Sequence, residues 1–575
     1  MFETPIGANL RPNRGPLAAV AARRPGNTRA ATAGSGPWWR LSPPLRSGFV
    51  ILLCAFSLGA ADLSVLKFCL RSEPKSFHPL KADDDASETV RFLTAGSLLK
   101  INRKTQLPEP ALATKWKVLD GGRTVQFQLR EGVRFSDGTA FAPEDVVYTF
   151  QQVAEIRSGF TDSLRQGDQA PVASVTGKSE VTVRFAGVVA GWERLIDGLA
   201  ILSAKSPLRE KAVLGAFSVA EHKAGQYVIL GRNPNYWLAG APRLDQIRMD
   251  ITANRDLEVL RFKRGEIHLI NKVDPEVYQA LAGQMPDAVR NAGVSLESEQ
   301  LWFNQVAKAP IPAYKLAWFR STAFRRAVSE SIRREDLARI AMKGLAVPGV
   351  GPVSPGNAVW FNQKLKAQAY APALALAKLQ KEGFRKQSDG LYDAGGHRVE
   401  FSIVTNAGNK TRERLASMIQ ADLGEIGIRV NVVTLDFPSL IERLTRGYNY
   451  EACLLGLSNV DQDPNGQMNV WLSSAAQHQW NPQQAKPETE WEAEIDKLVR
   501  AQSRTTVLAK RKELFDRVQA IVSEQAPVLY LVHKNVLSAV HPSVRNALVT
   551  VLFPHVFSNA EQIELQGSGV YRSSR

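Results

Sequence analysis

The sequence predicts an α/β protein that folds as at least two lobes, one of which carries a smaller α+β unit. Its length of 575 residues exceeds what one hydrophobic core usually serves. In the second half, a strand, a helix and a strand follow one another through short turns, the order that builds a right-handed parallel unit and a doubly wound sheet. In the first half, a hairpin leads into a short helix.

The parallel unit is predicted from its hydrophobic pattern. Residues 399–404 form a strand, and residues 428–433 form the next strand after Gly427 has ended the intervening helix. That helix spans residues 411–425. Its apolar face has helical spacing: Leu415, Met418, Ile419, Leu423 and Ile426. The short connections favour a parallel pair of strands with the helix packed on the sheet.

Two further helices are predicted upstream of this unit. One runs from Phe324 to near Gly344, and the other begins at Pro372 and ends at Gly383. Between them, residues 347–356 are rich in Gly and Pro. Because they lie between strongly periodic helices, we interpret them as a surface loop rather than as a linker between domains.

The α+β unit begins with the hairpin. Residues 116–119 and 124–129 flank a turn that starts at Asp120 and contains two glycines. The second strand directs its apolar side chains to one face: Val125, Phe127 and Leu129. Pro143 then fixes the first turn of a helix, and the two residues that follow it are acidic. These features predict a subdomain over residues 83–202.

The first 61 residues differ from the rest of the chain. They hold seven arginines against one acidic residue, Glu3, and end in an apolar run over residues 48–61. That run is too short to span a bilayer, which needs about 20 residues, but it suits a signal peptide that is cleaved before Asp62. A buried core helix is the alternative. The residues before Cys54 are not those of a lipid-modification site, so we expect a secreted soluble form.

The charge and cysteine content exclude some classes of protein. Removal of the seven arginines and one glutamate lowers the formal charge from +16 to +10. A basic balance favours acidic ligands or anionic surfaces, but without a basic motif it does not predict a nucleic-acid partner. After removal of the leader only Cys69 and Cys453 remain, so no disulfide framework or zinc pair is expected. The two could pair only if the fold brings them together.

The sequence contains no catalytic signature. It lacks the Gly-x-Ser-x-Gly turn, the His-Glu-x-x-His motif, the phosphate-binding loop and the dinucleotide fingerprint. None of the eight histidines forms a pair three or four residues apart, the spacing that would bind a metal on a helix. We therefore expect no catalytic residues, no metal and no cofactor. A secreted hydrolase remains the alternative from another class.

Eight blocks follow one another along the chain: residues 109–116, 127–139, 142–146, 232–237, 262–266, 302–304, 324–337 and 456–464. In this order they resemble the large periplasmic solute-binding proteins of the peptide/nickel class, solute-binding family 5 of the ABC transporters. The resemblance extends over about residues 74–560, and the shared order of the blocks carries it.

This resemblance implies a two-lobed periplasmic-binding-protein-like fold of the class II (cluster C) type. It has mixed sheets, two crossing hinge strands and an extra α+β subdomain. The expected domains are a leader (1–61), a discontinuous lobe I (62–82, 203–298 and 527–575), its subdomain (83–202) and lobe II (299–526).

The resemblance also implies a function. The chain would be the extracytoplasmic, periplasmic substrate-binding subunit of an ABC importer, a monomer that delivers a small polar solute to a permease complex in the inner membrane. A binding module that serves a sensor is an alternative. The ligand stays open between a peptide, a metal complex, a sugar and another polar solute.

The candidate ligand site follows from one segment. In relatives that bind peptides, a Gly-Trp pair precedes an Asp that lies four residues before a Pro and pairs with the ligand's amino terminus. Here Leu457 and Val460 stand at those two positions. The neighbouring polar residues Asn459, Asp461 and Asp463 are therefore the candidate contacts, since a carboxylate in a closed cleft binds a cation strongly. The alternative is that the two aspartates bond to backbone in an Asp-Pro turn.

Three other residues complete the predicted site. Trp302 and Asn304 come where the first crossing strand enters lobe II, so their side chains could reach the cleft. Trp480 lies in a polar stretch, residues 473–490, that could cover the ligand or form an ordinary solvated loop. For Trp302 a role as a core anchor is the alternative.

Overall fold

One long mixed sheet of eleven strands organises the computed structural model, which describes residues 63–457 and 460–566. The predicted leader, its cleavage site and Cys54 lie outside the described residues. In spatial order the strands are β17 (Arg429–Leu435), β16 (Glu400–Asn406), β18 (Ala452–Leu457), β12 (Val289–Phe303), β19 (Val528–Val540), β11 (Leu269–Ile270), β1 (Val65–Leu70), β10 (Gln246–Ile251), β9 (Tyr227–Arg232) and β8 (Phe217–Lys223), with β13 (Ala346–Pro348) beside β19.

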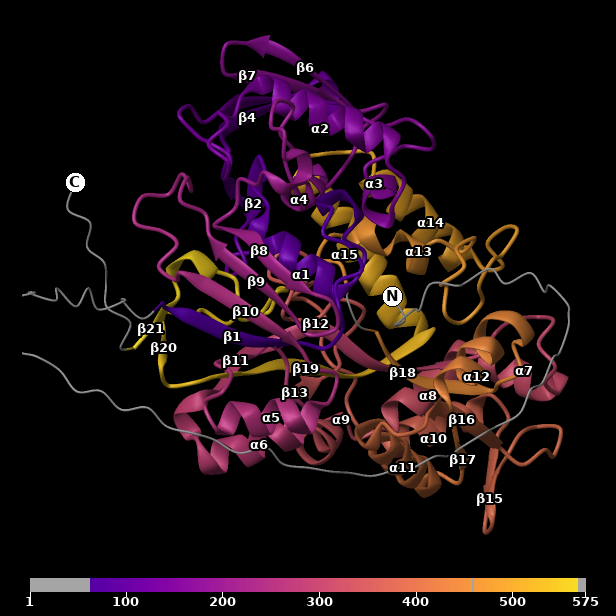
Figure 1. The fold of residues 1–575 in the computed structure, drawn as a ribbon. Helices are drawn as coiled ribbons and strands as arrows, with labels where there is room; N and C mark the ends of the chain where they lie inside the picture. Colours follow the sequence, from indigo (N-terminus) through magenta and orange to yellow (C-terminus); the bar gives the residue numbers. More distant parts are fainter. Residues whose placement is uncertain (1–62, 458–459, 567–575) are drawn as a thin grey trace, which may run out of the picture. The chain divides into compact units, whose positions relative to one another are not determined.

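The two longest strands, β12 and β19, lie in the middle of this sheet and pair antiparallel with each other (Figure 1). In the order of the sheet, β12 is followed on one side by β18, β16 and β17, and β19 is followed on the other side by β11 and β1. Their pairing shifts register three times, so the ribbon is irregular along its length. The expected pair of crossing strands is thus confirmed, and we call β12 and β19 the hinge strands.

The predicted parallel unit is confirmed in order and direction. β16 and β17 pair in parallel, and α11 (Lys410–Glu425) connects them. Asn409 begins the helix: its side chain accepts a hydrogen bond from the backbone N–H of Arg412. The apolar face of α11 is buried against this end of the sheet.

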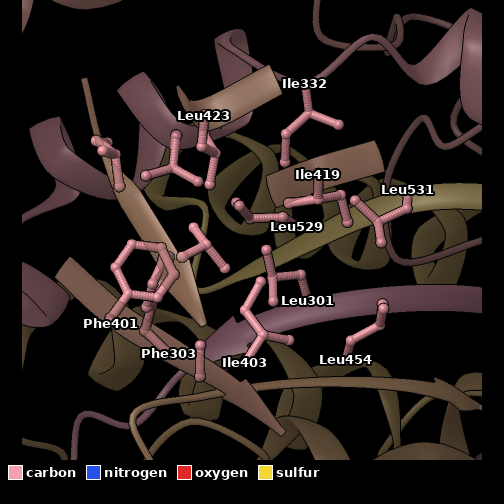
Figure 2. Packing of buried hydrophobic residues seen from close by; sticks show 14 of the residues in the cluster. Leu301, Phe303, Ile332, Phe401, Ile403, Ile419, Leu423, Leu454, Leu529 and Leu531 are labelled. Carbon is pink, nitrogen blue, oxygen red and sulfur yellow. The ribbon is translucent and has the colours of Figure 1, made fainter. Parts of the chain in front are cut away.

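The core on that face consists of aromatic and aliphatic side chains that lie between residues 301 and 532 (Figure 2). The ring of Phe303, at the end of β12, stacks on Phe319 at 5.0 Å and meets the edge of Phe401 at 5.2 Å between centroids. Leu529 and Leu531 of β19 pack into the same cluster. One end of both hinge strands is therefore anchored in a continuous hydrophobic core.

The predicted subdomain has its own sheet and its own core. Its strands are β4 (Ala113–Leu119), β5 (Thr124–Leu129), β7 (Glu180–Arg184) and β6 (Val172–Gly177), with β2 (Leu99–Ile101) and β3 (Pro108–Pro110) as a separate pair. The hairpin is confirmed as β4–β5, and the helix that begins at Pro143 is α2 (Pro143–Glu155). All three apolar side chains predicted to point inward from β5 are buried. The domain boundaries themselves stay predictions.

The remaining helices lie around the long sheet and the subdomain (Figure 1). They are α1 (Asp85–Thr94), α3 (Gly159–Ser163), α4 (Trp192–Gly198), α5 (Arg255–Lys263), α6 (Pro275–Gln284), α7 (Ala313–Arg320), α8 (Thr322–Glu330), α9 (Arg334–Asp336), α10 (Pro372–Lys381), α12 (Phe437–Glu442), α13 (Met468–Trp471), α14 (Glu490–Gln502) and α15 (Leu508–Gln525). The smaller strands are β14 (Arg385–Gln387), β15 (Gly390–Tyr392), β20 (Val544–Arg545) and β21 (Glu564–Leu565). The helix predicted from Pro372 is α10, so that prediction is confirmed.

The single helix predicted for residues 324–344 is wrong in its length. α8 ends at Glu330, and the chain resumes as the short α9, followed by a π-type turn. The buried guanidinium of Arg334 explains the break, because it donates a 2.7 Å hydrogen bond to the carbonyl oxygen of Ser329. In a continuous helix that oxygen would accept from the backbone four residues later.

The prediction of a surface loop over residues 347–356 is also wrong. The segment begins as β13 on β19, and its middle is buried. A Cβ at Gly349 would collide with the backbone of Tyr530 on β19, and one at Gly356 would collide with the carbonyl of Val294 on β12. The glycines therefore serve close packing of this segment against both hinge strands.

Candidate functional site

The segment after β18 contacts the predicted subdomain through an ion pair. Arg194 on α4 donates to both carboxylate oxygens of Asp461, at 2.5 and 3.0 Å. Both side chains are about one-third exposed. Desolvation lowers the pKa of the Arg194 guanidinium, but the Asp461 carboxylate more than offsets it and the pKa is raised. The predicted ligand carboxylate is thus occupied by a cation of this chain in the described conformation.

Asp463 is held by a different arginine. Arg511 on α15 donates to its two oxygens at 2.8 and 2.6 Å, and only 12% of the Asp463 side chain is exposed. One of those oxygens also accepts from the backbone N–H of Asn465, the bond that the turn interpretation expects, and ligand binding by Asp463 stays a prediction. The guanidinium lies over the ring of Trp360 at 4.7 Å from its centroid. Asp463 therefore fixes the shape of the segment from within lobe II.

The same turn also brings the side chain of Asn465 to the subdomain. Gln502 on α14 donates to the side-chain oxygen of Asn465 at 2.6 Å, and Asn465 donates in turn to the carbonyl oxygen of Ala190 at 2.5 Å. Gly191, just before α4, has φ of +72°, and a Cβ there would lie 2.6 Å from a carboxylate oxygen of Asp463. Side chains of Asp463 and Asn465 therefore lie directly against the backbone of residues 190 and 191.

A third contact involves a glutamine from the turn between β2 and β3. The side chain of Gln106 donates to the carbonyl of Gly356 at 2.7 Å and accepts from the backbone N–H of Ala358 at 2.9 Å. Gln462 donates to the backbone oxygen of Gln106 at 2.9 Å. Both glutamines are buried. We call these subdomain–lobe II contacts, made through Gln106, Ala190 and Arg194, the clasp.

Sequence reasoning missed the subdomain half of the clasp. Gln462 lies between the two predicted aspartates, so the segment itself was identified. Gln106 and Arg194 carry no local signal, because a glutamine in a turn and an arginine on a short helix are ordinary surface residues. Only their distance from the 461–465 segment in the folded chain reveals them.

The aromatic and amide candidates lie in packed surroundings. The indole of Trp302 is 1% exposed and its N–H donates to the hydroxyl of Tyr450 at 3.3 Å. Asn304 is fully buried and its amide donates to the carbonyls of Tyr448 and Tyr450, both at 2.8 Å. These contacts match the core-anchor alternative, and ligand binding by either residue stays a prediction.

Trp480 is likewise internal. Its indole N–H donates to Glu492 at 2.9 Å, and its ring lies 3.9 Å from the ring of His478. Glu492 also accepts a hydrogen bond from Gln484 at 2.8 Å, so residues 473–490, which could have been an ordinary solvated loop, contribute to a buried hydrogen-bond network. Asn459, the last candidate, lies outside the described residues.

An alternating row of charges follows one face of the hinge strands. Glu297 binds Lys272 at 2.7 Å and Lys534 at 3.1 Å. Glu299 binds Lys534 at 3.2 Å and Arg412 at 2.7 Å. Desolvation acts to raise the pKa of Glu297, but the two ammonium groups outweigh it and lower that pKa to about 2. The row extends from the β11 side of the hinge strands to α11, since Lys272 follows β11 and Arg412 belongs to α11.

The opposite face of the hinge carries neutral polar groups. Gln479 donates to the side-chain oxygen of Gln300 at 3.0 Å, and Gln300 donates to the hydroxyl of Ser298 at 2.7 Å. All three are buried. We call Ser298, Gln300 and Gln479 the neutral stripe. Its groups can exchange hydrogen bonds with a polar solute without any change of charge.

Within residues 63–457 and 460–566, no group of three or more His, Cys, Asp or Glu side chains is arranged to hold a metal. Cys69 and Cys453 are both free and buried, and burial raises the pKa of each thiol. Over the same residues, none of the helices combines the length and the apolar character needed to cross a membrane.

Comparison with known proteins identifies the family. The model of the bacterial extracellular solute-binding proteins, family 5 (middle region), matches residues 108–479. A di/tripeptide-binding protein of Pseudomonas aeruginosa is 24% identical over 553 positions, which cover 89% of this chain and 98% of the relative. Among solved structures, the ABC transporter substrate-binding protein CtaP of Listeria monocytogenes aligns with a TM-score of 0.72 at 20% identity, over 88% of this chain and 99% of its own.

NikA of Brucella suis, solved in complex with Fe(III)-EDTA, aligns with a TM-score of 0.69 at 20% identity, over 87% of this chain and 100% of its own. These likenesses confirm the two-lobed α/β fold that the sequence predicts. Because the family model alone matches well over half of the residues, the chain belongs to the bacterial extracellular solute-binding proteins, family 5.

Proposed function

We propose that this chain is the extracytoplasmic substrate-binding subunit of an ABC importer and that it closes over a small polar, peptide-like solute. Family membership supports the role, as do the names of the relatives, which include a di/tripeptide-binding protein and an ABC transporter substrate-binding protein. The observation that carries the proposal is the clasp, which joins the predicted subdomain to lobe II by side chains that separate if the lobes part.

The proposed mechanism uses the hinge strands. Rotation about β12 and β19 opens the clasp and exposes the neutral stripe and the 461–465 segment to solvent. A solute that makes contacts only in the closed form then shifts the equilibrium towards closure. The closed monomer docks on a permease complex in the inner membrane, which reopens it. In this proposal the mature protein begins near residue 62, after removal of the leader. Its ligand is a solute and not a nucleic acid.

The six predicted contacts take different parts in this proposal. Asp461 works with Arg194 to hold the closed form, and Asp463 fixes the turn that presents Asp461. Asn459 remains a candidate contact beside them. Trp302, Asn304 and Trp480 support the inner wall of lobe II, from which they act on the solute through packing. Substitution of each of the six residues tests whether it contacts the solute.

Small-angle scattering tests closure. The purified mature protein is measured alone and with ultrafiltered yeast extract, a mixture of small polar solutes. We expect the radius of gyration to fall when solute is added. Asp461→Asn is expected to reduce this compaction, because the bidentate bond to Arg194 loses its charge. Asp256→Asn, an exposed residue on α5, is the matched control and should behave as the parent protein.

Two results would contradict the proposal. An unchanged radius in the parent protein, with no solute retained after gel filtration, would exclude capture by closure. Sustained conversion of any solute in the extract by the purified protein would favour the secreted hydrolase instead. Mass spectrometry of the retained fraction reports on both, because a binding protein returns the solute unaltered and in a stoichiometric amount.

A further inference from the structure

One buried histidine on a hinge strand has a ring nitrogen without a partner. His533 on β19 is 1% exposed and pairs directly with Ser298 on β12, so the two side chains share a face of the ribbon. Its Nδ1 lies 3.4 Å from the carbonyl oxygen of Glu297, while Nε2 has no hydrogen-bond partner among the described residues.

The protonation state of this ring follows from its surroundings. A carbonyl oxygen can only accept, so the ring proton belongs on Nδ1 and Nε2 is left as an acceptor. Burial lowers the pKa of His533 to about 4, so the imidazole is neutral near pH 7. The unpartnered group is therefore an uncharged acceptor inside the protein.

A second acceptor lies next to it on the same strand. The side-chain oxygen of Asn535 is buried and has no partner among the described residues. Residues two apart on a strand point to the same side, so this oxygen follows Nε2 of His533 along the face that also carries Ser298. Buried polar groups without a partner are rare in folded proteins, and two such acceptors two residues apart on one strand indicate a missing donor.

The charged side chains near this face already form ion pairs within the chain. Lys534, between the two acceptors in sequence, points away from them and binds Glu297 and Glu299. Asp461 of the clasp is occupied by Arg194, and Asp463 is occupied by Arg511 within lobe II. Among the described residues of the two hinge strands, the buried side-chain nitrogen and oxygen atoms without a partner are Nε2 of His533 and Oδ1 of Asn535.

We propose that His533 and Asn535, beside the neutral stripe, form a subsite that accepts hydrogen bonds from an uncharged donor of the solute, a hydroxyl or an amide N–H, rather than from an ammonium group. This rests on the proposed function, because it takes the hinge face to be the floor of the solute site. It assigns the solute class: the part that reaches the hinge is neutral and rich in donors.

The experiment compares two neutral probes with a charged one. Affinities for maltotriose, N-acetyl-trialanine amide and trialanine are measured by calorimetry with the mature protein and with His533→Leu. We expect a neutral probe to bind the parent protein and to bind His533→Leu about tenfold or more weakly, the effect of one lost hydrogen bond. The sugar and the blocked peptide distinguish a hydroxyl donor from an amide donor.

Stability separates a solute contact from a structural role. Thermal unfolding of the solute-free His533→Leu protein should be unchanged or higher, because the substitution removes an unsatisfied acceptor. His268→Leu is the matched control: its Nδ1 accepts from the backbone N–H of Lys67, outside the proposed site, so it should lose stability and keep affinity. His533→Gln, which retains an acceptor, should recover part of the affinity.

Three outcomes would overturn the inference. They are equal affinity of the parent protein and His533→Leu for every probe, binding of trialanine alone, and no binding of either neutral probe. A water molecule bonded to Nε2, with affinity unaffected by the substitution, would assign the two acceptors to internal hydration. The proposed function is judged separately by compaction in yeast extract, so it can survive the loss of this inference.

Discussion

Two aspartates two positions apart in one segment do different work because their arginine partners come from different places. Asp463 is paired within lobe II by Arg511 and is largely buried, so it shapes its own turn. Asp461 is paired by Arg194 from the subdomain and keeps 29% of its side chain exposed. A buried pair is costly to break, whereas a partly exposed pair can exchange with solvent as the lobes move.

The side chain of Glu492 gives a prediction about pH. It accepts hydrogen bonds from Trp480, Gln484 and Thr489, and it is 2% exposed. Burial alone would raise its pKa, but these bonds and the contact with His478 lower it from 4.5 to about 2. A carboxyl whose pKa is depressed on folding contributes stability above its unfolded pKa and loses it as pH falls through the folded value.

We therefore expect Glu492 to contribute about 3 kcal/mol at neutral pH, lost between about pH 5 and pH 2. Urea unfolding at pH 7, 4 and 3 measures this. Glu492→Gln should lower stability at pH 7 and flatten the acid dependence, leaving the part due to Glu297, whose pKa is also about 2. Glu382→Gln, an exposed control, should leave the profile unaltered. Parallel profiles for all three proteins would contradict the assignment.

At the scale of elements, the start of α4 controls how closely the subdomain approaches lobe II. Gly191 combines a left-handed backbone with a close approach to the Asp463 carboxylate, and Asn465 bonds to the residue before it. The element is short, so its position depends on these contacts rather than on its own helical stability.

Gly191→Ala tests this approach. A Cβ at φ of +72° costs about 1 kcal/mol or more, and here it also lies 2.6 Å from Asp463. Gly225→Ala is the matched control, because φ is +68° but no atom lies within 4 Å of the added carbon. Both variants should lose stability in urea, and only Gly191→Ala should also reduce compaction in scattering. Equal behaviour of the two would mean that the contact has no part in closure.

At the scale of the whole molecule, the hinge strands belong to one continuous sheet and to one row of charges. The row runs from Lys272 beside β11 to Arg412 on α11, with Glu297, Lys534 and Glu299 between them. Lys534 occupies its centre and is shared by both glutamates. Its removal leaves each glutamate with one partner in place of two.

Lys534→Met is expected to lower the free energy of unfolding by about 2 kcal/mol, less than for a fully buried pair because the side chain is 27% exposed. Urea unfolding checks this. In the double variant with Glu299→Gln, the combined loss should be smaller than the sum of the two single losses, since the residues share one network. Additive losses would show that the row is not coupled across the hinge.

Local elements were predictable from the sequence because their causes are local. The hairpin at 116–129 follows from its glycine turn and alternation, and the β16–α11–β17 unit from its change of period. The prediction failed where a distant contact decided the outcome. A single helix over 324–344 could not be rejected without the contact of Arg334, and residues 347–356 resembled a loop because glycine suits both a loop and close packing.

The candidate site was predictable only in part. The segment that contains Asp461 and Asp463 was identified, but its partners Arg194, Arg511 and Gln106 come from distant parts of the chain. The sequence by itself determined the family, the two-lobed α/β fold and the absence of the usual Asp at Val460. The tertiary structure alone decided that the remaining carboxylates bind the chain's own arginines and that two neutral acceptors on a hinge strand are buried without a partner. The physical reason is that charge pairing and burial depend on contacts between residues far apart in the chain, 48 positions for Asp463 and Arg511 and 267 for Asp461 and Arg194.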